Sequence, residues 1–557
     1  MNKSIKSTAV WRDPLILSSS SQPADSEDIR PTDDDQGALD PQTYDAVEAD
    51  ALFDVINHTQ TQIGHLILYR SLARPISDTN ILQQKQDAVR ELETNPELTC
   101  DLQRFVKKMI PGERSLYHLL YGEFFGGLST SDEPRDGSKK LEFGGCGYRQ
   151  YVDGTEFVVE LVEEAKLLPP SKTAYLNELL NAIRDFSHSR TYALMHGPVY
   201  PSGGKFKIKQ EKPKLLPMLS FQPSLFKLLP ILMFMMAIGG IVGIFTFFQS
   251  MLPELGSYIG YGILVLTVPA IPVILFATGV SDRDSVIYPL RKQFRQSPEL
   301  AKALEALGMI DELLSLHHYD QSIDGAKVFP DILDNKHHLL NVTNAKNPLL
   351  IRSDPDFVPN DITLDSVGRL LIITGPNSGG KTAYCKTVVQ IQLLGQIGCC
   401  IPASTAQLVP VGRIYYQVPD PGRLEAGIGR FGHELKQTRE IFFNSTPHSL
   451  VILDELSEGT TFEERMSLSE YILTGFHKLG ASTLLVTHNH ELCERLQGNG
   501  LGRYLQVEFA PQGPTHRLIP GISRVSHADR VATEIGFSKE DVENHLSTRE
   551  QQTNKHI

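Results

Sequence analysis

Cysteine is scarce in this chain of 557 residues, which contains only six. None of them forms a Cys-x-x-Cys pair, and they are scattered as Cys100, Cys146, Cys385, Cys399, Cys400 and Cys493. Disulfide scaffolds and structural zinc sites depend on paired cysteines, so the sequence argues against both. We expect reduced thiols, most of them buried.

Positive charge is also in deficit. Lys and Arg number 53 against 66 Asp and Glu, which gives a formal net charge of −13. This balance excludes a uniformly basic protein that coats nucleic acid, because phosphate contacts would have to come from a local basic patch.

The length allows roughly three or four domains of about 150 residues each. With 41% hydrophobic residues, most of the chain can form ordinary buried cores. Residues 1–43 differ, because a serine run, an acidic run and few apolar residues predict a disordered acidic tail. Apolar residues at helical spacing predict a helical core over 44–202 that returns over 284–330. Short β-rich runs alternate with helices from there on, which predicts an α/β domain over 331–515.

Two runs in the middle of the chain have the length and composition of membrane spans. Residues 228–248 and 258–280 contain no charged side chain. A helix of about 20 apolar residues crosses a bilayer core of about 30 Å. With a short connection between them, the runs predict a two-helix transmembrane hairpin and its basic flank over 203–283. The alternative is a pair of buried helices in a large soluble core.

Basic residues lie outside both ends of this hairpin and none lies in its connection. They are Lys205, Lys207, Lys209, Lys212, Lys214 and Lys227 before it and Arg283, Arg291, Lys292 and Arg295 after it. This pattern predicts a multi-pass membrane protein with two spans, with both termini and the α/β domain on the cytoplasmic side. The lysines could serve nucleic acid, but their place beside an apolar span favours anionic lipid. No apolar signal segment follows Met1, so we expect insertion to depend on the hairpin.

A phosphate-binding loop follows an apolar run at 370–374 that is suited to a buried strand. The loop matches G-x-x-x-x-G-K-[ST], in which glycines let backbone amides face phosphate oxygens and the next helix offers its positive end. Lys381 should reach the β- and γ-phosphates, and the Thr382 hydroxyl should bind Mg²⁺. The predicted nucleotide-binding residues are Gly375, Pro376, Asn377, Ser378, Gly379, Gly380, Lys381, Thr382 and Ala383.

Two further apolar runs end in residues suited to phosphate chemistry. The run 449–453 is followed by Asp454 and Glu455. Asp454 is placed to hold Mg²⁺, and Glu455 is placed to polarise an attacking water. The run 482–486 is followed by Thr487 and His488, and His488 could contact the γ-phosphate or the water. We therefore predict Glu455, His488 and Lys381 as catalytic residues, with Thr382 and Asp454 as metal ligands.

Together these motifs resemble the MutS family of mismatch-repair ATPases, within the ABC ATPase class. The loop TGPNSGGKT contains that family's Pro-Asn pair, DELSEGT is similar to its second acidic motif, and TLLVTHNHEL is similar to its histidine segment. Residues 357–361 resemble its adenine-side segment, and residues 52–64 and 303–317 resemble the start and return of its helical core. Residues 520–536 resemble its dimerisation element, which suggests a C-terminal helical element over 516–557.

This resemblance implies an α + α/β architecture, in which a helical core with the inserted hairpin precedes an ABC-type P-loop ATPase domain. It implies ATP and Mg²⁺ as cofactors and a homodimer, because ABC-type sites are completed by a second subunit. Three departures stand out. We expect the mismatch-reading domain to be absent and the DNA clamp to be replaced by the hairpin. The segment similar to the trans-acting signature has Gly429 and Arg430 where the family has Ser-Thr, so Arg430 could supply a cation across the dimer.

Three functions remain open at this point. The first is an ATPase coupled to binding of mismatched, damaged or branched DNA. The second is a membrane signalling or assembly ATPase that acts on a protein partner and binds no DNA. The third, a transporter-like ATPase, is disfavoured because two spans per subunit make a poor pathway and no LSGGQ-type signature is present.

Overall fold

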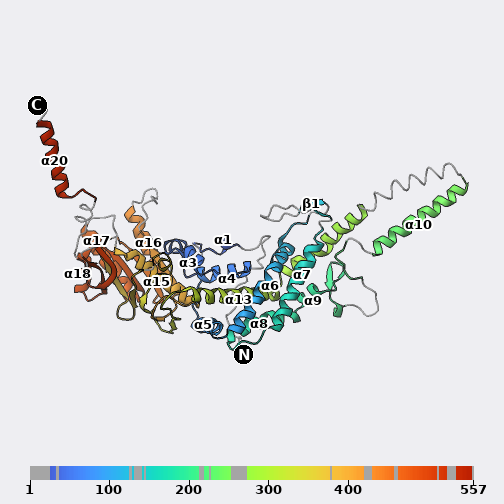
Figure 1. The fold of residues 1–557 in the computed structure, drawn as a ribbon, viewed down its shortest axis with the longest axis horizontal. Coiled ribbons are helices and arrows are strands. Elements are labelled where there is room, and N and C mark those ends of the chain that lie inside the picture. Colours follow the sequence, from blue (N-terminus) through green and yellow to red (C-terminus); the bar gives the residue numbers. More distant parts are fainter. Residues whose placement is uncertain are drawn as a thin grey trace. The chain divides into compact units, whose positions relative to one another are not determined.

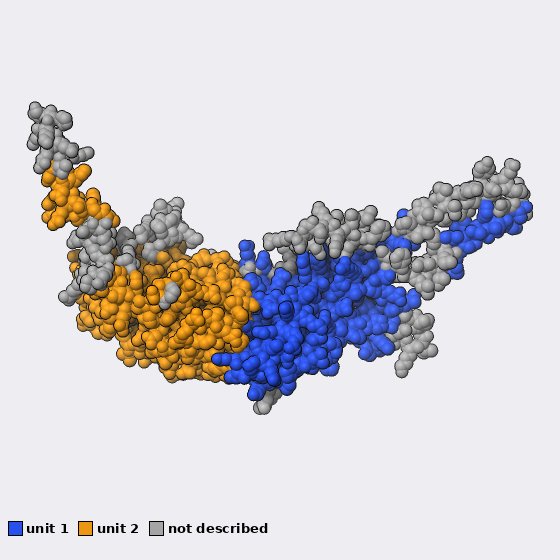
Figure 2. Space-filling model, in the orientation of Figure 1, with its two compact units in different colours: residues 1–28, 59–67, 91–314 blue, residues 29–58, 68–90, 315–557 orange. Residues whose placement is uncertain are grey.

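The computed structural model describes residues 25–32, 37–124, 128–130, 141–143, 146–211, 219–224, 228–251, 273–354, 356–376, 379–418, 430–456, 462–510, 513–523 and 535–554. The chain divides into two compact units, which are coloured separately in Figure 2. The first comprises residues 1–28, 59–67 and 91–314, and the second comprises residues 29–58, 68–90 and 315–557.

Long helices build most of the first unit (Figure 1). Helices α6 (Pro96–Tyr121) and α7 (Tyr148–Leu167) pack along each other. They approach closely because Gly154 has no side chain, and a Cβ there would lie 2.8 Å from the Cβ of Leu119. The unit also contains helices α8 (Ala174–Asp185), α9 (Arg190–His196), α10 (Leu228–Met251) and α12 (Tyr288–Arg295), the 3₁₀ turns η1 (Phe186–His188) and η2 (Lys209–Glu211), the π-helical turn η3 (Arg283–Ile287), and the hairpins β1 (Leu128–Thr130) with β2 (Leu141–Phe143) and β3 (Tyr200–Ser202) with β4 (Lys205–Lys207).

Two buried acids in this unit hold the start of helix α4 (Gln62–Ala73). The Glu113 carboxylate accepts the Gln62 and Ile63 amides at 2.9 and 2.7 Å. The Asp311 carboxylate accepts the Thr61 amide at 2.8 Å and the Thr61 hydroxyl at 2.7 Å. The first amides of a helix have no partner within the helix, so these two acids supply acceptors that the backbone itself lacks.

The predicted membrane location is wrong. Within the part of the chain that the structure describes, no helix combines the length and apolar composition needed to cross a bilayer. A span requires about 20 apolar residues in one helix. The first run lies in α10, and of the second run residues 258–272 lie outside the described residues, while 273–280 are helical. The lipid-binding role predicted for the lysines before the first run depended on a membrane location and is therefore not supported.

A six-stranded sheet forms the centre of the second unit, in the order β10-β11-β12-β8-β13-β14. The first five strands are parallel, and β14 pairs antiparallel to β13 at one edge. Strands β8, β11 and β12 are buried along almost their whole length, as expected for a parallel sheet covered on both faces. The strands are β8 (Leu370–Thr374), β10 (Arg413–Gln417), β11 (Ser449–Asp454), β12 (Ser482–Thr487), β13 (Arg503–Ala510) and β14 (Gly513–Pro520).

Helices cover this sheet. The side chains of Leu473 and Phe476 on α17 (Phe462–Leu479) and of Leu496 on α18 (His490–Gly498) pack into one core with the strands. Helices α15 (Lys381–Gln396) and α16 (Arg430–Asn444) contact strands β12 and β10 (Figure 1). A second sheet has the order β5-β9-β6-β7, with β5 (Asp331–Ile332), β9 (Thr405–Leu408), β6 (Leu340–Ala345) and β7 (Asn360–Leu364). The remaining helices are α1 (Ser26–Ile29), α2 (Pro41–Ala46), α3 (Ala49–Ile56), α4, α5 (Thr79–Thr94), α13 (Pro298–Ser322), α14 (Leu350–Ser353) and α20 (Lys539–Asn554).

Part of the predicted disordered tail is folded. Ile29 and Leu39 are fully buried, and the Ile414 amide donates to the Ala38 carbonyl at 2.7 Å. Residues 1–24 lie outside the described residues. At the other end, β14 extends to Pro520, so residues 516–520 are strand rather than helix. Residues 524–534 of the predicted dimerisation element lie outside the described residues, and α20 follows them.

Candidate functional site

The predicted site residues meet at one edge of the six-stranded sheet. Strands β11, β12 and β8 are parallel neighbours, with Asp454 opposite Val486 and Thr487 opposite Thr374. Their carboxyl ends therefore lie side by side, and in open α/β sheets this edge is where ligands bind. This register brings together the loop after β8, the two acids at the end of β11 and the histidine after β12.

The loop after β8 depends on glycine at two positions. Gly375 has a φ of 134°, a conformation that residues with a side chain rarely adopt. A Cβ on Gly379 would lie 2.6 Å from Val507 Cγ2, so the loop packs against β13 too closely for any side chain. Pro376 and Gly380 are partly exposed beside them. Asn377 and Ser378 lie outside the described residues.

Lys381 begins helix α15 and is almost completely buried. Its ammonium donates a hydrogen bond of 2.6 Å to the Gly375 carbonyl and folds back over the loop. Burial lowers the pKa of Lys381 to about 8, and the nearby charges of Asp454 and Glu455 act in the opposite direction. The lysine thus holds a positive charge inside the loop, close to two carboxylates.

Asp454 and Glu455 stand at the end of β11. Burial raises the pKa of Asp454, and the adjacent Glu455 raises it further, while Lys381 lowers it. Glu455 has a φ of 57°, in the left-handed region that only glycine adopts readily, and its amide donates to the Val486 carbonyl at 3.0 Å. Such backbone strain costs on the order of 1 kcal/mol or more and concentrates at functional sites. The strand end therefore fixes an unusual direction for the Glu455 side chain.

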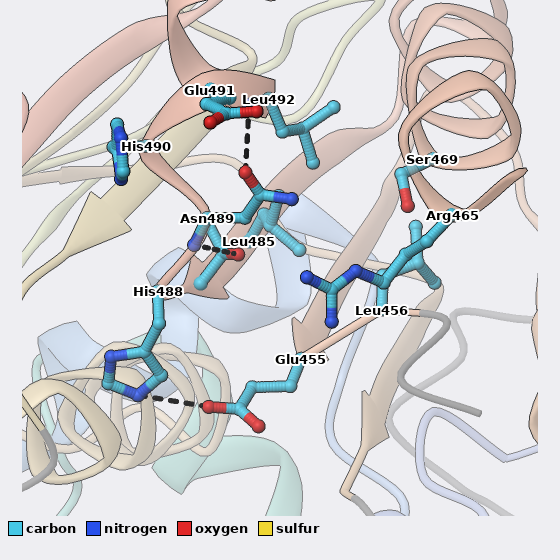
Figure 3. Close-up of a pocket in the computed structure, with 11 residues that line it drawn as sticks. Glu455, Leu456, Arg465, Ser469, Leu485, His488, Asn489, His490, Glu491 and Leu492 are labelled. Carbon is cyan, nitrogen blue, oxygen red and sulfur yellow. Dashed lines mark hydrogen bonds and ion pairs between the residues drawn. The ribbon is translucent and has the colours of Figure 1, made fainter. Parts of the chain in front are cut away.

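His488 lies beside Glu455. Its Nε2 is 3.0 Å from Glu455 Oε1, and the two side chains are 42% and 21% exposed (Figure 3). They come from neighbouring strands, so the contact requires the β11–β12 pairing. A histidine in hydrogen-bond contact with a carboxylate can orient it or share its proton.

A cavity of about 450 Å³ opens next to the loop and matches the segment predicted to lie near adenine. Phe357 and Val358 line one side of it, and Thr382 and Ala383 from the first turn of α15 line another. Thr382 is exposed, so its hydroxyl is accessible. An apolar wall facing a helix N-terminus can accept a base on one side and phosphates on the other.

Sequence reasoning missed His516 on β14, which lines the same cavity. Asn360 on β7 connects this strand to β14 through its side chain. Its side-chain nitrogen donates to the His516 backbone carbonyl at 3.0 Å, and its side-chain oxygen accepts the Leu518 backbone amide at 2.7 Å. Asn360 itself belongs to the segment that the sequence singled out. His516 gave no local signal, since it reaches the cavity only through the antiparallel pairing of β13 and β14.

The signature-like segment begins helix α16 at Arg430, whose side chain, like Gly429, lies outside the described residues. Further along, the Thr438 hydroxyl donates to the Gln417 side chain at 2.9 Å, and Gln417 donates to the Glu434 carbonyl at 3.1 Å. These bonds tie α16 to the end of β10. The role of Arg430 across a dimer stays a prediction.

The residues present fit a magnesium nucleotide. A buried lysine already donates to an oxygen acceptor inside the loop, and the Asp454 carboxylate accepts no hydrogen bond from the described part of the chain. A hydroxyl and a carboxylate are oxygen ligands of the kind that Mg²⁺ prefers. Asp454 and Thr382 supply these two groups.

Two family models match the chain. The model of MutS domain III matches residues 36–316, and the model of MutS domain V matches residues 371–544. The first match alone covers half of the 557 residues. The chain belongs to the MutS family.

Curated relatives are similar over parts of the chain. The DNA mismatch repair protein Msh6 of Gallus gallus is 31% identical over 40% of this chain and 18% of its own length. The DNA mismatch repair protein MutS of Oceanobacillus iheyensis is 33% identical over 36% of this chain and 23% of its own. The Endonuclease MutS2 of Pelotomaculum thermopropionicum is 32% identical over 44% of this chain and 30% of its own. The matched part thus spans less than a third of each of these relatives.

Proposed function

We propose that this MutS-family chain binds ATP with Mg²⁺ at the edge of its six-stranded sheet and hydrolyses it. The single observation that carries the proposal is the juxtaposition of Lys381 with Asp454 and Glu455, residues that come from separate segments of the chain. A buried ammonium beside two carboxylates suits a site that handles phosphate and a divalent cation.

In this proposal each residue has one task. Lys381 holds the β- and γ-phosphates, and Thr382 and Asp454 hold Mg²⁺, which when bound neutralises charge on those phosphates. Glu455 accepts a proton at its carboxylate from the attacking water. The water oxygen bonds to the γ-phosphorus as the bond to the β-phosphate oxygen breaks. His488 orients the Glu455 carboxylate through the 3.0 Å contact.

The test is ATP turnover by the full chain with Mg²⁺, compared with Glu455→Gln. We expect this variant to bind ATP but to hydrolyse it at least about a hundredfold more slowly, as for loss of a general base. Glu494→Gln, an exposed acid on α18, is the matched control and should keep the parent rate. Equal rates for Glu455→Gln and the parent would remove Glu455 from the mechanism.

We further propose that this ATPase acts on DNA. The support is the family membership and the mismatch-repair names of the relatives. ATP binding and hydrolysis would then alternate between two states of a homodimer that differ in their affinity for DNA. The second candidate is an ATPase that acts on a protein partner, favoured by the acidic charge balance of the chain.

Binding of homoduplex, mismatched and branched DNA separates these two candidates. The assay uses purified protein with and without ATP at two salt concentrations, beside Lys381→Ala. Selective binding that depends on both DNA structure and nucleotide supports the DNA function. A weak background that disappears with salt supports the partner-directed function, since non-specific phosphate contacts are salt-sensitive.

A further inference from the structure

A second cavity, of about 200 Å³, is lined by Glu455 and His488 but by none of the loop residues described above (Figure 3). Its walls come from the end of β11, the end of β12, the start of α18 and one face of α17. Glu455 and His488 belong to the catalytic group proposed above, so the cavity begins at the residues that would handle the γ-phosphate. No part of the ATP mechanism uses the rest of it.

Helix α17 directs two polar side chains into this cavity. Arg465 and Ser469 are four residues apart, which places them on the same helical face, and Figure 3 shows both pointing inward. Ser469 is completely buried, and its hydroxyl has no hydrogen-bond partner among the described residues. A buried hydroxyl without a partner has lost its hydrogen bonds to water, which costs free energy. A ligand that bonds to this hydroxyl offsets that desolvation cost.

The first turn of α18 lines the opposite wall. The Asn489 side chain caps this helix by accepting the Leu492 amide at 3.1 Å, and His490 and Glu491 begin it. The start of a helix carries partial positive charge from its unpaired amides. This helix start and the Arg465 guanidinium on α17 both favour an anion in the cavity, against the negative charge of Glu491, which also lines it.

The Glu455 carboxylate in the same cavity selects among anions. An ionised carboxylate can only accept hydrogen bonds, so it repels an anion that carries no proton. Phosphate at neutral pH keeps at least one hydroxyl, which can donate to Glu455, whereas sulfate has none. The combination of basic donors and an acidic acceptor therefore fits hydrogen phosphate better than sulfate.

We propose that this cavity is a binding site for hydrogen phosphate, with Arg465, Ser469 and the start of α18 as donors and Glu455 as acceptor. It receives the phosphate released at the γ-position, and in this respect the proposal rests on the proposed ATP hydrolysis. Phosphate binding itself can be measured without hydrolysis, which keeps the two claims separable.

The experiment is equilibrium dialysis of radiolabelled inorganic phosphate against the full chain with ADP and Mg²⁺. We expect saturable binding that equal sulfate does not displace. Arg465→Ala should weaken phosphate binding at least about tenfold, since charge-assisted hydrogen bonds are the strong ones. Ser469→Ala should weaken it less. Arg495→Ala, an exposed arginine on α18 outside the cavity, is the matched control and should bind as the parent does.

Phosphate binding that is the same in Arg465→Ala and the parent overturns the proposal, and so does displacement by sulfate as efficient as by phosphate. If Arg465→Ala fails to fold, the sulfate competition in the parent and the Ser469→Ala variant decide. Arginine-dependent phosphate binding in a chain that does not hydrolyse ATP would keep this site and reject the proposed function. ATP hydrolysis without arginine-dependent phosphate binding would keep the proposed function and reject this phosphate site.

Discussion

Two pairs of acids in this molecule, one buried and one half-buried, differ in what their oxygens contact. Glu113 and Asp311 in the helical unit accept backbone amides and a hydroxyl at 2.7 to 2.9 Å. Asp454 at the sheet edge accepts no hydrogen bond from the described residues, and Glu455 contacts His488. The first pair is occupied by its own backbone, which marks a structural role. Asp454 keeps bonding capacity for a ligand, which is what the proposed nucleotide site requires of it.

This difference predicts that removing an acid of the sheet edge lowers ATP hydrolysis, whereas removing an acid of the helical unit lowers stability. Asp454→Asn should reduce Mg²⁺-dependent ATP hydrolysis by about a hundredfold or more, because a metal ligand is lost. Its free energy of unfolding should stay within about 1 kcal/mol of the parent or rise, because a half-buried charge without protein donors is removed. Hydrolysis assays and chemical denaturation check the two halves. A marked loss of stability would make Asp454 structural and break the comparison.

Removal of Glu113 should lower the stability of the protein and leave ATP binding unchanged. Glu113→Ala leaves the buried Ile63 amide without its acceptor, and we expect a loss of about 2 to 3 kcal/mol in unfolding free energy. Denaturant unfolding measures this loss, and ATP affinity should not change. Glu97→Ala, an exposed acid in the first turn of the same helix, is the control. A stable Glu113→Ala with weakened ATP binding would reverse the assignment.

The same carboxyl predicts a pH dependence. Burial raises the pKa of Glu113 from 4.5 to about 6, against the effect of the two amides. The folded state then holds this proton more tightly than the unfolded state, so the stability that comes from this bound proton is present below about pH 4.5 and is lost as pH rises through about 6. The change is about 2 kcal/mol. Unfolding curves of the parent and Glu113→Gln between pH 4 and 7 should therefore differ in slope over this window, and parallel curves would contradict the prediction.

The smallest effect is expected at Asn360, which connects β7 to β14. Asn360→Ala removes two hydrogen bonds near the cavity that contains Phe357 and His516. We expect a loss of about 1 to 2 kcal/mol in stability and a weaker ATP affinity by a few fold, with the hydrolysis rate of bound ATP unchanged. Thermal unfolding and ATP titration measure these effects. A large fall in turnover at saturating ATP would instead indicate that Asn360 contributes to the hydrolysis step.

Much of the candidate site could be predicted from the sequence because its signals are local. A buried strand followed directly by a glycine-rich loop, and a strand followed by Asp454 and Glu455, reveal their geometry without the rest of the fold. The parallel pairing of β8, β11 and β12 then brings these ends together. The helical spacing of apolar residues likewise indicated α6, α7 and α13.

The remaining features depend on tertiary structure. Arg465, Ser469 and His516 enter their cavities through the packing of α17 and the pairing of β14, neither of which leaves a sequence motif. Asp311 meets Thr61 across 250 positions of the chain. The membrane prediction was wrong, because no helix among the described residues is long and apolar enough to cross a bilayer.

Equilibrium binding of ATP with Mg²⁺ to the parent and to Lys381→Ala tests the central claim most directly. Lys381 is the residue that lies inside the loop and donates to its Gly375 carbonyl. We predict that the parent binds ATP and that Lys381→Ala, folded to the same extent by circular dichroism, loses at least about a hundredfold in affinity because a charged phosphate contact is lost. Equal affinity in the two proteins would contradict the assignment of this sheet edge as the nucleotide site.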